Sequence, residues 1–337
     1  MRRLLIVGFA VVAAVAPIPR PFIERWYTGA LYPRLQHALT GFSNRIPFAL
    51  FDVILIGGAA LAAVWIYRKA RQRPLRAALK RAIVESATAA AIVYLVFLLT
   101  WGLNYRRVPV ADRVDFDASR VTREAAGELG ARVAAQLNTL YAEAHRRQTP
   151  LESLLAAFAR AQHSLGADWT IVPGRPKQTL LGEYFHQTSI SGMTDPFFLE
   201  TMIAPDLLDV EKPFVIAHEW AHLAGYADES EANFVAWLTC QYGDASARYS
   251  AALMMIGYVR PPGRTLQQAL TIGPRIDLYS IRERYAHTSR ALQVAAREGY
   301  DTYLKANRVR AGIDSYDLVV QLVLGTALDA RGDPILR

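Results

Sequence analysis

The sequence predicts a mainly α-helical protein in which membrane-spanning helices precede an α+β domain with a small sheet. The chain of 337 residues is 52% hydrophobic and only 20% charged, and its mean hydropathy of +0.11 is high for a soluble enzyme. Residues 1–103 contain 13 Lys and Arg but only three acidic residues, whereas the other 234 residues contain 25 basic and 27 acidic ones. Positive charge confined to an apolar segment is typical of membrane proteins, so we expect no nucleic-acid partner. The single cysteine, Cys240, excludes an internal disulfide and a cysteine-based zinc site.

Three apolar runs, at residues 4–19, 47–67 and 82–103, predict three transmembrane helices. The second and third are about 20 residues long, which is enough to cross a hydrocarbon core. The first follows Met1-Arg2-Arg3 and resembles a signal peptide, but Pro17 disfavours cleavage after Ala16, so we expect an uncleaved span. Residues 1–103 are therefore expected to form a membrane region, and residues 104–337 a second domain.

Basic residues between the apolar runs predict the orientation of the chain. The segment between the second and third runs lacks acidic residues and holds seven basic ones: Arg68, Lys69, Arg71, Arg73, Arg76, Lys80 and Arg81. The positive-inside rule places this cluster and the N-terminus in the cytoplasm. Three crossings then place the domain at 104–337 on the extracytoplasmic side. We expect a multi-pass protein of the cytoplasmic membrane, with the lipid bilayer as a partner.

The second domain reads as mostly helical. Helix-like apolar spacing runs through residues 121–164, with a break at Thr149-Pro150, and Pro213 is expected to open another helix. Residues 168–198 differ, because they combine turn-forming residues with short β-prone pieces at 169–172 and 187–191. We therefore expect turns and a small sheet before the helix at Pro213.

The helix after Pro213 carries the sequence His218-Glu219-Trp220-Ala221-His222, an HExxH motif. Residues four apart lie on one helix face, so both imidazoles can bind a single ion, for which we expect Zn²⁺. Glu219 lies between them around the helix, close to the ion without binding it. It is the expected general base, because it can accept a proton from a zinc-activated water.

A catalytic zinc site needs a third protein ligand and an open position for water. Gly225 is expected to end the helix, and three carboxylates follow it: Asp228, Glu229 and Glu231. Asp228 and Glu231 have the D-x-x-E spacing of a capping box, which favours Glu229 as the third ligand. Asp228 and Glu231 remain alternatives. Asn233, one turn beyond Glu229, is a candidate to orient a ligand.

Other residues are weaker candidates. Residues 187–203 are the expected edge segment along which a peptide substrate would pair. Four side chains are candidates to stabilise a developing oxyanion, although an ordinary structural role is the more expected one for each: Tyr184, His186, Tyr226 and His287. Asp52 and Glu85 lie near the ends of apolar runs, where they are expected to reach the interface without a functional role.

The HExxH motif followed by Glu229-Ser230-Glu231-Ala232-Asn233 resembles the gluzincin group of zinc metallopeptidases, including HtpX and CAAX-prenyl-protease type membrane peptidases and the ImmA/IrrE peptidases. Most of the chain resembles a bacterial family of membrane-anchored proteins regarded as zinc metallopeptidases, through residues 101–106, 191–200 and 300–316. The resemblance implies a zincin-like domain with Glu229 as the third ligand, but no particular substrate. The gap between His222 and Glu229 is shorter than in HtpX-type enzymes.

The expected function is a zinc-dependent endopeptidase of the bacterial cell envelope that acts on a peptide or protein substrate. One alternative is a non-proteolytic envelope assembly or scaffold protein with structural zinc. The presence of Glu219 favours catalysis, because a structural site has no use for a general base. A second alternative, a zinc hydrolase acting on a non-peptide amide or ester, is not distinguished by the sequence.

Overall fold

The computed structural model describes residues 1–337 except 72–74, 264, 287 and 308–317. As the sequence predicts, the chain is mainly helical and has a small two-stranded sheet. The elements in chain order are α1 Arg2–Val15, α2 Arg20–Phe22, the π-helix η1 Ile23–Leu31, α3 Tyr32–Ser43, α4 Leu50–Ala70, α5 Leu75–Thr100, η2 Gly102–Arg106, α6 Val110–Arg113, η3 Ala118–Arg120, α7 Arg123–Ala144, α8 Leu151–Ser164, α9 Gly182–Thr188, β1 Gly192–Asp195, β2 Glu200–Ile203, α10 Lys212–Leu223, α11 Glu229–Tyr242, α12 Ala245–Met255, α13 Leu266–Ala269, α14 Ile272–Ala286, α15 Arg290–Ala306 and α16 Val319–Gly325.

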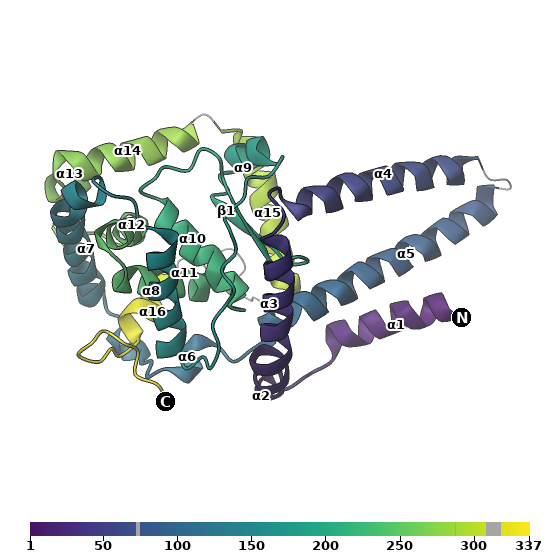
Figure 1. Cartoon of the computed structure of the whole chain (residues 1–337), viewed down its shortest axis with the longest axis horizontal. Coiled ribbons are helices and arrows are strands. Elements are labelled where there is room, and N and C mark those ends of the chain that lie inside the picture. Colours follow the sequence, from purple (N-terminus) through teal and green to yellow (C-terminus); the bar gives the residue numbers. More distant parts are fainter. Residues whose placement is uncertain (72–74, 264, 287, 308–317) are drawn as a thin grey trace.

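Two of the three expected spans are helices long and apolar enough to cross a membrane. They are α4 and α5, which project from the domain as a pair, so that the end of α4 and the start of α5 lie far from it (Figure 1). The expected first span differs, because α1 ends at Val15 after 14 residues and the chain then turns by 110° into the helical stretch 20–43. Pro17 and Pro19 explain this stop, since proline lacks the N–H that an α-helix needs and restrains the residue before it.

The acidic residues of the apolar helices have structural partners. At the far end of the α4–α5 pair, the Glu85 carboxylate lies 2.7 Å from Lys69 Nζ and 3.3 Å from Arg3 Nη1. At the domain end, Asp52 accepts hydrogen bonds from Thr179 Oγ1 at 2.5 Å and Leu180 N at 3.0 Å. Asp52 therefore ties the first turn of α4 to the domain.

The sheet lies against α10, which is buried at the centre of the domain with α11 (Figure 1). Strands β1 and β2 are antiparallel, with Gly192 opposite Ile203 and Asp195 opposite Glu200. Lys177 makes an isolated parallel bridge to Met202 on the other side of β2. The predicted positions of the strands are wrong, because residues 169–172 form no strand and residues 187–188 belong to α9. The sheet forms instead at Gly192–Asp195 and Glu200–Ile203, where Asp195, Glu200 and Thr201 are buried.

A buried ion pair joins the sheet to the N-terminal helices α3 and α4. Lys177 Nζ lies 2.8 Å from Glu200 Oε2, and both side chains are almost fully buried. Glu200 also accepts hydrogen bonds from the Ser43 hydroxyl at 2.9 Å and the backbone N–H of Phe51 at 2.8 Å. The pair thus connects β2 to the end of α3 and the start of α4.

Replacing Lys177 with Met should destabilise the protein, because it leaves the Glu200 carboxylate buried without its cation. Breaking a buried pair in this way costs about 3–5 kcal/mol. We expect the unfolding temperature of the purified protein in detergent to fall by roughly 10 °C. The double variant Lys177→Met/Glu200→Gln should recover part of the loss, since no unpaired charge remains. A single variant as stable as the native protein would contradict this role.

Candidate metal centre

The HExxH motif occupies the last two turns of α10. Pro213 lies in the first turn of this helix, where the missing N–H has no consequence. The helix ends at Leu223, and Gly225 follows with φ of +81°, a conformation that side-chain-bearing residues rarely adopt. A Cβ at Gly225 would also lie 2.8 Å from Asn104 Oδ1. Glycine therefore allows the chain to turn sharply towards α11, as the sequence predicted.

The turn at Gly225 brings Glu229, the first residue of α11, to the two motif histidines. Glu229 Oε2 lies 3.2 Å from His218 Nε2 and 3.6 Å from His222 Nε2, and the two imidazole nitrogens are 3.1 Å apart. Ligand atoms bound about 2 Å from a tetrahedral ion lie about 3.3 Å from one another. Of the described residues, these three form the one group of His, Cys, Asp and Glu side chains that could hold a metal ion.

The contacts around these three side chains fit a cation. His222 Nδ1 lies 2.8 Å from the Tyr226 carbonyl, which leaves Nε2 directed at the ligand group. Tyr300 of α15 donates a hydrogen bond to Glu229 Oε1. Glu229 Oε2 is buried and accepts no hydrogen bond from any described residue. A carboxylate oxygen that is buried among two imidazole nitrogens is a donor set typical of zinc.

The electrostatics of the site also favour a positive charge. Burial alone lowers the pKa of His222, but the nearby Glu229 carboxylate outweighs it and raises this pKa to about 9. Burial likewise opposes ionisation of Glu229, yet the two imidazoles hold the pKa of this carboxyl well below its usual range. The buried carboxylate therefore keeps its negative charge only beside a proton or a metal ion on the histidines.

Glu219 lies beside this group and is buried, with 3% of its surface exposed. Its Oε2 accepts a hydrogen bond from Thr194 Oγ1 of β1 at 2.7 Å. A Cβ at Gly192 would lie 2.5 Å from Glu219 Oε1, so only glycine lets the carboxylate pack against the strand. Burial raises the pKa of Glu219 above its ordinary value.

The two alternative ligands have other roles. Asp228 is the N-cap of α11, and its Oδ1 accepts a hydrogen bond from Ser230 N at 2.9 Å. Glu231 is buried and accepts a hydrogen bond from Val110 N at 2.6 Å, which ties α11 to α6. The expected capping box is therefore replaced by a single cap and a tertiary contact. Asn233 is buried nearby, but no described contact joins it to a ligand.

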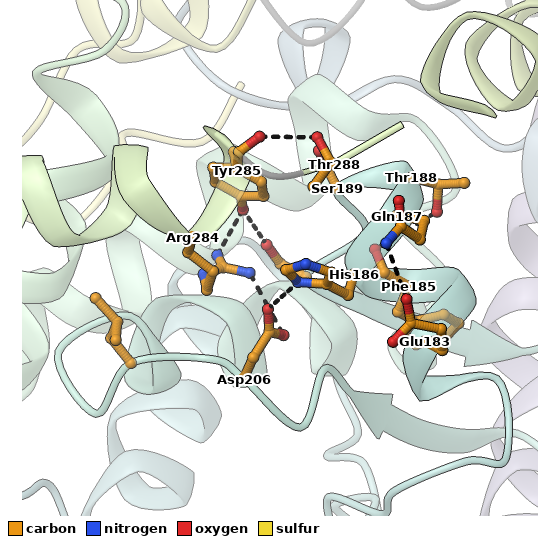
Figure 2. Close-up of polar contacts among 12 residues, drawn as sticks. Glu183, Phe185, His186, Gln187, Thr188, Ser189, Asp206, Arg284, Tyr285 and Thr288 are labelled. Atoms are coloured by element: carbon orange, nitrogen blue, oxygen red, sulfur yellow. Dashed lines mark hydrogen bonds and ion pairs between the residues drawn. The ribbon is translucent and has the colours of Figure 1, made fainter. Parts of the chain in front are cut away.

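The weaker candidates take structural positions. Tyr184 is 44% exposed on α9, and the buried Tyr226 ring packs under the Arg107 guanidinium at 4.6 Å. His186 Nδ1 lies 2.7 Å from Asp206 Oδ2 in the network of Figure 2. His287 and residues 308–316 lie outside the described residues.

The Figure 2 network holds the start of β1 in place. Arg284 of α14 reaches Asp206 on one side and donates a hydrogen bond to the Tyr285 hydroxyl at 2.6 Å on the other. The Tyr285 hydroxyl is also 2.9 Å from Ser191 Oγ. Because Ser191 directly precedes Gly192, this network fixes the strand that packs on Glu219.

Sequence reasoning missed Thr194, Tyr300 and the Tyr226 carbonyl. Tyr300 was noticed only as part of the segment that carries the family resemblance. No local spacing signals the contacts of Thr194 and Tyr300, because they join α10 to β1 and α11 to α15 across 25 and 71 residues of sequence. The Tyr226 carbonyl, in contrast, lies only four residues from His222.

A family model described as "Protein of unknown function (DUF3810)" matches residues 27–324, which include every residue of the metal centre. The chain belongs to this family. No curated protein and no solved structure matches the chain. Within the DUF3810 region lie α10, α11, both strands and the two apolar helices α4 and α5, so the candidate centre and both apolar helices fall inside the region that the family model matches.

Alanine variants of the three carboxylates should separate the ligand from its neighbours. Glu229→Ala should lose most of its bound zinc, because it removes one of the three convergent donors. Asp228→Ala should keep its zinc and lose about 1 kcal/mol of stability with the N-cap. Glu231→Ala should also keep zinc while leaving the Val110 N–H without its acceptor, at a cost of about 1–3 kcal/mol.

Zinc content per protein after purification, measured by elemental mass spectrometry, reads out all three variants. Unfolding temperatures measured on the same samples control for misfolding. If Glu229→Ala retained zinc while Glu231→Ala lost it, the assignment of the third ligand would be wrong.

Proposed function

We propose that the protein is a membrane-anchored zinc metallopeptidase with a zincin-like domain. The observation that carries this proposal is the convergence of His218, His222 and Glu229, with the buried Glu219 carboxylate directly beside them. Three protein donors leave a fourth position open, which is the arrangement of catalytic rather than structural zinc sites. A structural site would also have no use for a second buried carboxylate beside its ligands.

Each residue of the site has a separate role in the proposed hydrolysis. His218, His222 and Glu229 would hold a zinc ion, which supplies a Lewis acid and lowers the pKa of a water to about 7. Glu219 accepts the proton from the attacking water and passes it to the leaving amine. Its raised pKa suits both transfers, because a base with a pKa closer to neutral both accepts and releases a proton readily. Thr194 holds the Glu219 carboxylate in position through Oε2.

Strand β1 offers a surface for an extended peptide. It pairs with β2 along one edge, and in the described residues no strand pairs with its other edge. Gly192 and Thr194 of the same strand contact Glu219. A peptide that adds to this edge as a further strand would therefore run past the general base.

Glu219→Gln should abolish peptide hydrolysis and leave zinc bound. Glutamine keeps the size and polarity of the side chain but cannot accept the proton from water at pH 7. Glu128→Gln, at an exposed position of α7, is the matched control and should behave as the native protein. Terminal-peptide proteomics of envelopes from cells expressing each variant reads out cleavage, and purified protein gives the zinc content. Envelope peptides that are cut equally with and without Glu219 would remove it from the mechanism.

The orientation proposed is a cytoplasmic N-terminus and an extracytoplasmic catalytic domain. The domain-facing ends of α4 and α5 lie on one side of the apolar pair, and their other ends, with Arg68 and Lys69 in the last turn of α4, lie on the opposite side (Figure 1). The excess of arginine and lysine favours the cytoplasm for this second side.

A fusion reporter should test the orientation. A fluorescent protein that matures only in the cytoplasm should be dark when fused after Arg337, where it follows the catalytic domain across the membrane. The same reporter inserted after Arg71 should be bright and controls for expression. A bright fusion at Arg337 would place the metal centre inside the cell.

A further inference from the structure

The helical stretch of α2, η1 and α3 does not follow the direction of the apolar helices. It leaves α1 at 110° and runs across the base of the domain, crossing the direction of α4 and α5 (Figure 1). Helix α3 contacts α5 on one side and β2 on the other. The stretch therefore lies between the domain and the apolar helices.

One face of this stretch is fixed to the domain by buried polar groups. Tyr32 donates a hydrogen bond to the Leu223 carbonyl at 3.0 Å, and Thr40 donates one to the Leu199 carbonyl at 2.7 Å. Gln36 Nε2 donates another to the Val172 carbonyl at 2.7 Å. All three side chains are fully buried, so the opposite face must point away from the domain.

The face away from the domain is aromatic and basic. Phe22, Trp26 and Phe42, together with Phe48 just after the stretch, are each about half exposed. Arg25, Arg34 and Arg45 are exposed beside them, and none of the three forms an ion pair with a described residue. Exposed aromatic rings beside unpaired arginines are typical of a helix at a membrane interface.

The length of the apolar helices supports the same placement. Glu85, with its Lys69 and Arg3 partners, marks the level at which charge begins at the far end of α5. From Glu85 to Thr100 the helix rises only about 22 Å, whereas a hydrocarbon core is about 30 Å thick. With this charge at the interface, about 8 Å of hydrocarbon is left at the base of the domain, where apolar surface can meet it.

We propose that α2, η1, α3 and Phe48 form an interfacial platform. This platform lies in the plane of the extracytoplasmic surface of the cytoplasmic membrane. Its aromatic side chains enter the upper acyl region, and Arg25, Arg34 and Arg45 bind the phosphates of anionic phospholipids. The lipid surface is thus a specific partner of this segment, in addition to the hydrocarbon around the spans.

Spin labels on single cysteines test the depth of the platform in the full-length protein reconstituted in nanodiscs. The native Cys240 is fully buried and is replaced by Ala in every variant. Labels at Trp26→Cys and Phe42→Cys should be accessible to oxygen and shielded from a water-soluble nickel chelate. Tyr279→Cys, on the exposed face of α14, is the matched control and should show the reverse. If the labels at positions 26 and 42 had the same accessibility to oxygen and to the nickel chelate as the control, the proposed platform would be wrong.

Brominated lipids test the arginines. Bromine on a lipid quenches the fluorescence of a nearby tryptophan. The quenching that occurs in the native protein but not in Trp26→Phe therefore reports the lipids beside Trp26. Brominated phosphatidylglycerol should quench this signal more than brominated phosphatidylcholine, because each arginine near the surface enriches anionic lipid roughly fivefold. The triple variant Arg25→Gln/Arg34→Gln/Arg45→Gln should lose the preference but keep the depth measured by the spin labels. Equal quenching by both lipids in the native protein would overturn the assignment of the arginines to anionic headgroups.

Discussion

The C-terminal end of α10 is the point on which the arrangement of the whole protein depends. A helix leaves its last carbonyls without partners, and a buried helix end must find donors elsewhere. Here Trp101 Nε1 binds the His222 carbonyl at 3.1 Å, Tyr32 binds that of Leu223, and Arg107 Nη1 reaches that of Ala224 at 3.3 Å. Tyr32 belongs to α3, and Trp101 and Arg107 lie just after the apolar helix α5. The end of the helix that carries the HExxH motif is therefore completed by one residue of α3 and by two residues that follow α5.

The segment around Trp101 therefore supports the HExxH helix directly. The Trp101 ring also packs edge-on against the His222 ring, with centroids 6.1 Å apart. Tyr105 and Phe97 contact Tyr303 of α15, whose neighbour Tyr300 reaches Glu229. The last turn of α5 thus supports both halves of the candidate centre, the imidazoles of α10 and the carboxylate of α11. With the platform at the membrane surface, hydrolysis as proposed would occur next to the lipid headgroups.

The candidate centre destabilises the fold unless a cation is bound to it. Glu219, Glu229 and His222 are buried together, and burying charged groups without a compensating ion costs several kcal/mol for each. The neighbouring side chains mitigate this cost only in part, since Glu229 Oε2 receives no hydrogen bond from the described residues. A bound cation would compensate both the carboxylate and the nitrogen lone pairs, which is why the proposed zinc site accounts for the arrangement better than a purely structural cluster.

The sequence by itself determined the features that depend on local spacing. It predicted the apolar helices α4 and α5, the helix opened by Pro213, the convergence of His218 and His222, and Glu229 as the nearest third carboxylate. These follow from helix periodicity and from a glycine turn of a few residues. Only the tertiary structure decided that Pro17 and Pro19 end α1 early, that Glu231 binds Val110 instead of capping α11, and that the strand lies at Gly192. It also placed Thr194 on Glu219 and Tyr300 on Glu229. Such contacts join segments that are far apart in the chain, so no local pattern encodes them, and they form only when buried polar groups find their partners during packing.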